Sequence, residues 1–331
     1  MASTESPTAT PANPGRPPVC QMIDGSLYSM FLDPVLFRKA AELKTEDGDI
    51  IQVTFPKCGT HWVQQIIQLI LNKGESPRDF EEFVKRAPFL EYQGAEALEG
   101  MASPRTIRTH LPMNKIAFNK NAKYVYVARN PWDCCMSSYH FMTMMPQWQM
   151  REATFDDFLK VFVKGEWGFG DYFEHVMGAY KLRDEPNVFF VTYEQLKEDT
   201  RDTILKLAFF LGEDYGRMLE NDKDLMEDVM RKSGTEYMRD IVKTSNANLA
   251  SLFIKNPLLV SRLPKPSDDE KESTGGKISF VRVGKVDGWK EEFTQHQLRI
   301  LQKKIEEISK DSDIMDLWKK QWLSAKEEAA K

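Results

Sequence analysis

The sequence predicts an α/β domain in which a central parallel sheet is flanked by helices. Three segments support this prediction, because in each a β-type stretch runs directly into a helix-forming one: residues 50–72, 123–141 and 187–211. Strands that alternate with helices are typical of a parallel sheet with helices on both faces, and such sheets bind ligands at the carboxyl ends of their strands. We therefore expect a single domain whose functional residues follow the strands.

Composition excludes several classes of function. The 331-residue chain carries a net charge of −5, which argues against a general nucleic-acid-binding protein. Its four cysteines show no C-x-x-C spacing, so neither a zinc knuckle nor a disulfide framework is indicated, and no metal is expected. The N-terminus lacks an apolar signal core, and no run of about 18 apolar residues occurs. We therefore predict a cytoplasmic protein that does not bind a membrane.

The two ends of the chain differ in character. Residues 1–19 are rich in Pro, Ser, Thr and Ala, a composition that predicts a disordered tail ahead of one domain over residues 20–331. Residues 264–288 are rich in Lys, Gly and Ser and predict a long loop, which in a compact domain is often functional. Residues 294–329 predict helix with an exposed charged face.

The first strand-to-helix corner has the form of a phosphate-binding turn. Residues 50–55 predict a buried strand, and helical spacing of apolar residues begins at Trp62. The unpaired N–H groups at a helix start attract an anion, while Lys57 adds a positive charge and Thr60 a hydroxyl donor. An ATP-type P-loop needs its Lys after the second Gly, whereas Lys57 precedes Gly59, so this is not a Walker A loop. A solvated Lys beside an ordinary turn is the alternative.

Two other strand ends carry residues suited to anion binding or proton transfer. Arg129 closes a predicted strand and Ser137 follows two helical turns later; both can reach one phosphate, although Arg129 could equally form a salt bridge with a helix carboxylate. His110 ends the short strand before Pro112, and an imidazole with a pKa of about 6.5 can accept a proton from a hydroxyl near neutral pH. A single His is more often structural than catalytic, so the residues around His110 decide between these two roles.

Four stretches, in order along the chain, resemble the cytosolic sulfotransferase family, which uses 3′-phosphoadenosine 5′-phosphosulfate (PAPS). They are Thr54–Trp62, Arg108–Pro112, Val127–Ser137 and Lys277–Lys290. The resemblance implies an α/β fold with a P-loop-like 5′-phosphosulfate turn. It also implies in-line transfer of a sulfuryl group from PAPS to a hydroxyl or amine of a small-molecule acceptor, leaving 3′-phosphoadenosine 5′-phosphate (PAP), with no metal.

The resemblance also implies roles for individual residues. His110 corresponds to the catalytic base, Lys57 to the group that stabilises the departing phosphate oxygen, and Arg108 to a contact of the moving sulfuryl group. The implied donor-binding residues are Lys57, Cys58, Gly59, Thr60, His61, Trp62, Arg129, Ser137, Tyr193, Arg282, Val283 and Gly284.

The acceptor pocket implied by the resemblance uses Phe89, Tyr92 and Phe141, with the first two in a loop of exposed aromatic residues at 88–92. Aromatic walls favour flat phenols or catecholamines, and hydroxysteroids remain an alternative. On the residues alone, each of these aromatic side chains could instead belong to the core.

The sequence departs from the family pattern at four places. Val283 stands where a Lys is usual, and Asp287-Gly288 reverses the common Gly-Asp order. The family's adenine-contacting segment falls near residues 224–226, which do not reproduce it. In the family's dimer motif Gln295 and Arg299 replace Val and Glu, so a homodimer is possible but not through the usual motif.

Two other functions are compatible with a phosphate-binding α/β domain. One is a nucleotide-dependent phosphotransferase, against which the missing Walker A pattern and the additional phosphate-type residues Arg129, Ser137 and Arg282 argue. The other is a non-catalytic protein that binds hydroxylated small molecules, which the presence of both Lys57 and His110 disfavours.

Overall fold

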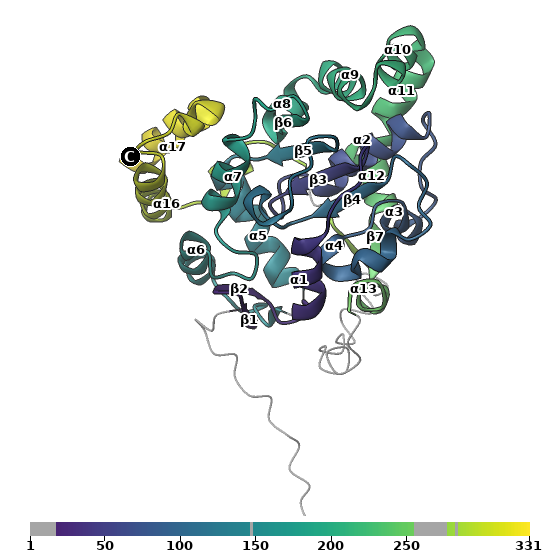
Figure 1. Ribbon diagram of the computed structural model, residues 1–331. Helices are drawn as coiled ribbons and strands as arrows, with labels where there is room; N and C mark the ends of the chain where they lie inside the picture. The colour runs from purple at the N-terminus through teal and green to yellow at the C-terminus, as the bar shows by residue number, and fades with distance from the viewer. Residues whose placement is uncertain (1–17, 146–147, 255–276, 282–283) are drawn as a thin grey trace, which may run out of the picture.

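The computed structural model of the protein describes residues 18–145, 148–254, 277–281 and 284–331 (Figure 1). Its central sheet has four parallel strands in the order β4-β3-β5-β6. These strands are β3 (Ile50–Thr54), β4 (Thr106–Thr109), β5 (Lys123–Ala128) and β6 (Val188–Thr192). The predicted parallel sheet is confirmed. Because β3 and β5 are neighbours at its centre, the turns that follow them lie side by side.

The two faces of the sheet bury separate groups of apolar side chains, because successive residues of a strand point to opposite sides. On one face Ile50, Val125 and Val191 pack in one cluster with the apolar residues of α2 (Thr60–Leu71), α9 (Thr200–Leu211), α10 (Glu213–Asn221) and α11 (Lys223–Lys232). On the other, Ile51 and Tyr126 join a larger cluster with α5 (Pro131–Met144), α6 (Phe155–Lys164) and α7 (Tyr172–Tyr180). Both faces are therefore covered by helices, as a parallel sheet requires (Figure 1).

The remaining elements surround this sheet. Ahead of β3 lie β1 (Cys20–Ile23), β2 (Ser26–Ser29) and α1 (Pro34–Glu42), and between β3 and β5 lie α3 (Phe80–Arg86), α4 (Leu90–Gln93), η1 (Ala95–Leu98) and η2 (Met113–Lys115). After β6 follow α8 (Tyr193–Glu198), α12 (Thr235–Ile241), β7 (Lys243–Ser245), α13 (Asn246–Phe253), β8 (Lys277–Ser279) and η4 (Gly288–Glu291). The chain ends with α16 (Gln295–Ile308), η5 (Ile314–Trp318) and α17 (Lys319–Ala330). No helix within the described ranges is both long and apolar enough to span a membrane.

Local sequence signals set the starts of the helices that follow the strands. The side chain of Asn130 accepts a hydrogen bond from the N–H of Asp133 at the start of α5, and Pro131 suits the first helical position. Thr192 and Gln195 form a capping box at the start of α8. The predicted single helix after residue 193 is divided into α8 and α9 at Asp199, whose side chain caps α9.

Three sequence-based expectations are corrected by the structure. Residues 88–92, predicted as a loop with exposed aromatic residues, lead into the short helix α4, and Phe89 is only 6% exposed because it packs under α13. The predicted loop over 264–288 contains strand β8, which pairs with β7. The predicted helix over 294–329 is three elements, since the chain turns at η5. Residues 1–17 of the predicted tail lie outside the described residues.

Candidate active site

A cavity of about 700 Å³ opens at the carboxyl ends of the parallel strands. Of the residues predicted to bind donor or acceptor, it is lined by Lys57, Gly59, Thr60, His61, Trp62, Phe89, Tyr92, His110, Arg129, Ser137, Phe141, Tyr193 and Gly284. Residues separated by more than 200 positions in the sequence thus meet at one edge of the sheet. This is the position that the fold class predicts for a ligand.

The turn between β3 and α2 is held in a conformation that exposes its backbone to the cavity. Gly59 has φ 106° and Lys57 has φ 68°, both in the left-handed region. A Cβ atom at residue 59 would lie 3.0 Å from the ring of Tyr193, so glycine satisfies both a conformational and a steric requirement. The hydroxyl groups of Thr60 and Thr54 lie 2.8 Å apart, which orients Thr60 at the helix start. The N-terminus of α2 therefore faces the cavity with its positive end.

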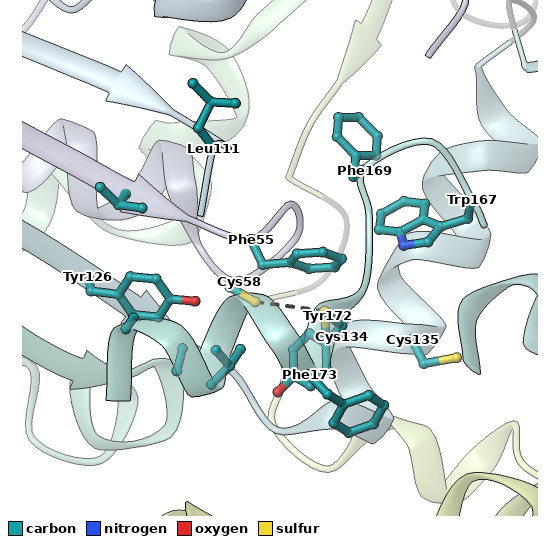
Figure 2. Close-up of a cluster of buried hydrophobic side chains, with 14 of the residues drawn as sticks. Phe55, Cys58, Leu111, Tyr126, Cys134, Cys135, Trp167, Phe169, Tyr172 and Phe173 are labelled. Carbon is teal, nitrogen blue, oxygen red and sulfur yellow. Dashed lines mark hydrogen bonds between the residues drawn. The ribbon is translucent and has the colours of Figure 1, made fainter. Parts of the chain in front are cut away.

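Cys58 differs from its neighbours in the turn. Its side chain is fully buried, does not line the cavity, and lies 3.7 Å (Sγ to Sγ) from Cys134 of α5. Figure 2 shows this contact beside Phe55 and Tyr172, in the apolar cluster that supports the turn from below. Its main-chain N–H donates to the carbonyl of Phe55 at 3.3 Å.

Arg129 links the two turns that follow β3 and β5. Its guanidinium donates to the carbonyl oxygens of Lys57 (3.2 Å) and Lys285 (3.0 Å) and lies 4.5 Å from the ring centre of Tyr193. The salt bridge with a helix carboxylate that the sequence left open is also present at long range, with Nη2 3.8 Å from Asp133. The alternative of a salt bridge is therefore present, while a phosphate contact of Arg129 stays a prediction.

His110 lines the cavity beside Phe89. Its Nδ1 atom donates to the carbonyl oxygen of Thr54 at 2.6 Å, since a carbonyl can only accept, and this leaves Nε2 as the basic nitrogen. Burial, opposed by that hydrogen bond, lowers the pKa of His110 to about 3. His175, which the sequence did not single out, donates from Nε2 to the carbonyl of His110 at 3.1 Å and lies with Nδ1 2.7 Å from the hydroxyl of Tyr126. The imidazole of His110 is neutral and oriented.

Arg108 is not brought to the cavity surface. Its side chain is completely buried, with Nε donating to the carbonyl of Ala87 at 2.7 Å and the guanidinium 4.8 Å from the ring centre of Phe89. Its Nη1 and Nη2 atoms have no hydrogen-bond partner within the described parts of the chain. Burial lowers the pKa of Arg108 to about 9. Phe89 lines the cavity in front of it, and Arg108 itself is not among the lining residues.

One end of the cavity has the character of a binding site for a nucleobase. Trp62 and Tyr193, both among the implied donor-binding residues, meet edge to face with ring centres 5.1 Å apart. The opposite lining includes Met230 and the turn at 233–235 between α11 and α12, rather than residues 224–226. The signal for this turn in the sequence is weak, a Ser-Gly-Thr stretch that ends a helix.

The other end of the cavity is aromatic. Phe89 lies 4.6 Å and Phe169 5.8 Å from His110 between ring centres, so two apolar rings flank the imidazole. The ammonium group of Lys57 lies 4.6 Å from the ring centre of Phe141, which joins the phosphate turn to this aromatic end. Lining residues that the sequence did not identify are Met144, Met145, Trp148, Phe169, Leu249, Phe253 and Phe280. They come from several loops and helices, so no single stretch of the sequence groups them.

The loop at 284–289 is tied to α5 by one carboxylate. Asp133 accepts hydrogen bonds from the main-chain N–H groups of Asp287 (2.9 Å) and Trp289 (3.1 Å). Asp287 has φ 61°, a conformation that Asp tolerates better than most residues, and this accommodates the reversed Asp-Gly order. Gly284 lines the cavity, while Arg282 and Val283 lie outside the described residues.

The residues of the altered dimer motif make contacts within the chain. Thr294 forms a capping box with Gln297 at the start of α16, and Arg299 donates to the carbonyl of Ala329 at 2.8 Å. Across the ranges that the structure describes, no group of three or more His, Cys, Asp or Glu side chains is arranged to hold a metal ion.

Comparison with known proteins shows which family this chain resembles. A sulfotransferase domain model matches residues 47–313. Sulfotransferase 1C2 of Oryctolagus cuniculus is 30% identical over 283 residues, which cover 81% of this chain and 86% of that protein. The amine sulfotransferase of the same species is 30% identical over 292 residues (87% and 89%), and the 3-alpha-hydroxysteroid sulfotransferase of Cavia porcellus is 32% identical over 264 residues (78% and 82%).

Solved structures share the fold. Mouse sulfotransferase SULT7A1, complexed with PAP, matches with a TM-score of 0.67 at 22% identity, covering 92% of this chain and 99% of that one. Retinol dehydratase in complex with androsterone and PAP matches with a TM-score of 0.63 at 21% identity, covering 84% and 87%. At these identities the likeness concerns the arrangement of helices and strands.

Proposed function

Because this chain belongs to the sulfotransferase domain family and is thus a sulfotransferase, we propose that it transfers a sulfuryl group from PAPS to the hydroxyl of a phenol or catecholamine, with His110 as base. The observation that carries the proposal is that His110 and Lys57 line one cavity between an end suited to a nucleotide and an aromatic end. A donor and an acceptor could therefore meet at these two side chains.

Several features of the first end support PAPS as the donor. The backbone around Gly59 and the start of α2 suit a 5′-phosphate, and Arg129 with Ser137 suits the additional 3′-phosphate. Trp62 and Tyr193 suit a flat base. SULT7A1 and retinol dehydratase, whose folds match this one, were both solved with PAP.

The proposed chemistry assigns one step to each polar residue. Nε2 of His110 takes the proton from the acceptor hydroxyl as the acceptor oxygen bonds to sulfur, and the bond from sulfur to the 5′-phosphate oxygen of PAPS breaks. Lys57 then stabilises the negative charge on that oxygen. For Arg108 we propose an electrostatic role from behind Phe89, because its charge is among those that lower the pKa of His110.

The aromatic end supports a flat acceptor. Phe89 and Phe169 flank His110, and Phe253 lies 5.7 Å from Tyr92 between ring centres, so an aromatic acceptor would contact ring faces and edges on several sides. Hydroxysteroids and amines are the competing acceptors, since relatives at 32% and 30% identity carry those substrates in their names.

The test is transfer of labelled sulfate from PAPS to phenols, catecholamines, amines and hydroxysteroids, with His110→Ala beside the wild type and the exposed His296→Ala as control. We expect sulfated phenol or catecholamine from the wild type and from His296→Ala, and none from His110→Ala. Product confined to amines or steroids would overturn the proposed acceptor. PAP binding without turnover would indicate a non-catalytic binding protein, and ATP binding equal to that of PAPS would indicate a phosphotransferase.

A further inference from the structure

We propose that Trp318, in the C-terminal segment, is a positioning residue for the donor-binding end of the cavity and acts through Glu194. The inference rests on the proposed PAPS-dependent function. Trp318 lies in η5, beyond residues 47–313 that the sulfotransferase domain model matches, and it is 2% exposed. Its indole Nε1 donates to Oε2 of Glu194 at 2.8 Å, across 124 positions of sequence.

Glu194 connects this indole to the strand end that carries Arg129. It directly follows Tyr193, and its second oxygen, Oε1, accepts from the main-chain N–H of Asn130 at 3.1 Å and from the Asn130 side-chain amide at 2.6 Å. Both carboxylate oxygens are therefore used, one toward the C-terminal segment and one toward the corner between β5 and α5.

Asn130 connects Glu194 by hydrogen bonds to the segment that carries the residues proposed to hold the 3′-phosphate. It stands between Arg129 and α5, caps that helix, and donates from its side chain to Oδ2 of Asp133 at 2.9 Å. Asp133 in turn binds the main-chain N–H groups of Asp287 and Trp289. One continuous set of hydrogen bonds thus runs from Trp318 to the β5–α5 corner and to the 284–289 loop.

Loss of the indole N–H would leave Oε2 of Glu194 without this donor in a largely enclosed site. A carboxylate in that position is costly unless it finds another partner, so we expect Glu194 to shift and its bonds to Asn130 to weaken. The expected result is weaker donor binding with little effect at the aromatic end, because no link of the set touches Phe89, Phe141 or Phe169.

The chain offers a matched control for this loss. Trp322 lies one helical turn further along the same segment, and its Nε1 is buried without a hydrogen-bond partner among the described residues. Trp318→Phe and Trp322→Phe therefore each remove an indole N–H from one segment while keeping an aromatic ring, but only the first breaks a bond to Glu194.

The experiment compares the wild type with both variants. It measures PAP affinity by calorimetry and the KM values for PAPS and for an acceptor that the wild-type enzyme sulfates. We expect Trp318→Phe to weaken PAP binding and to raise the KM for PAPS, each by about threefold to tenfold, while its KM for the acceptor stays unchanged. PAP binding by Trp322→Phe should equal that of the wild type. Glu194→Gln should weaken PAP binding similarly, and the double variant should lose no more than either single one, because both changes break one path.

Other outcomes overturn the proposal in distinguishable ways. Equal PAP affinity of the Trp318→Phe and Trp322→Phe proteins, with or without a lower Tm for the first, would give Trp318 a structural role only. If Trp318→Phe does not fold, wild-type PAP affinity in Glu194→Gln would be equally decisive against the path. A wild-type protein that binds no PAP would overturn the proposed function together with this inference.

Discussion

The Nδ1 atom of His110 lies 2.6 Å from the main-chain carbonyl oxygen of Thr54, the last residue of β3. Through this bond the strand that leads into the phosphate turn also sets the tautomer of the imidazole at the next strand end. The same strand therefore positions both Lys57, three residues later, and the nitrogen proposed to accept the proton. The groups proposed for charge stabilisation and for proton transfer are therefore both supported by β3.

The low pKa of His110 gives a spectroscopic prediction. Because burial lowers this pKa to about 3, the ring should remain neutral throughout the range from pH 5 to 8 in the ligand-free protein. We expect the His110 imidazole signals in an NMR titration to stay constant over that range. Comparison with His110→Asn assigns the signals, and an inflection near pH 6.5 from His110 would contradict the buried, neutral arrangement.

Lys57 gives a prediction about turnover. Lys57→Met keeps an unbranched apolar side chain but removes the ammonium group, which lies over the ring of Phe141, so binding should change less than the chemical step. We expect a decrease in kcat of about 100- to 1,000-fold, in the range found when one preorganised donor is removed. Single-turnover kinetics would measure it, with the exposed Lys39→Met as control. Unchanged kcat in a folded Lys57→Met protein would exclude Lys57 from the chemistry.

Arg129 gives a prediction about donor selectivity. Arg129→Gln should weaken the binding of PAP by about 10- to 100-fold while changing the binding of 5′-AMP much less, because only PAP carries the 3′-phosphate. The ratio of the two affinities, measured by calorimetry, separates phosphate recognition from the support that Arg129 gives the two loops. Arg217→Gln, an exposed position on α10, serves as control. An equal loss for both nucleotides would assign Arg129 to loop support alone.

Glu91 gives a prediction about stability and pH. It is 2% exposed, accepts from the N–H of His110 at 2.7 Å, and burial raises its pKa from 4.5 to about 7. Between these values the folded protein binds more protons than the unfolded chain, so Glu91 lowers stability as pH rises from about 4.5 to about 7. Glu91→Gln lacks this titration.

The free energy of unfolding of Glu91→Gln, relative to the wild type, should therefore rise from pH 4.5 to pH 7, by up to about 3 kcal/mol. Guanidinium unfolding at pH 5 and pH 8 measures the change. A difference between the two proteins that is the same at both values would show that Glu91 ionises in the folded protein as it does in the unfolded chain.

The amino-acid sequence alone determined the parallel sheet and the position of its main functional turns. Strands 50–54 and 123–128 are rich in apolar and β-branched or aromatic residues and are followed by Gly59 and by Asn130-Pro131, so their boundaries depend on local chemistry. Lys57, Arg129 and His110, which follow three neighbouring strands, line one cavity because parallel strands bring their carboxyl ends to one edge.

Only the tertiary structure decided which neighbouring side chains reach that cavity. Arg108 lies two residues before His110 but is buried behind Phe89, since the packing of α3 and α4 determines what stands in front of it. Phe169 and Trp318 carry no local signal, and their contacts with His110 and Glu194 arise from elements distant in sequence. Side-chain contacts of this kind depend on how whole helices pack, which no short stretch of sequence specifies.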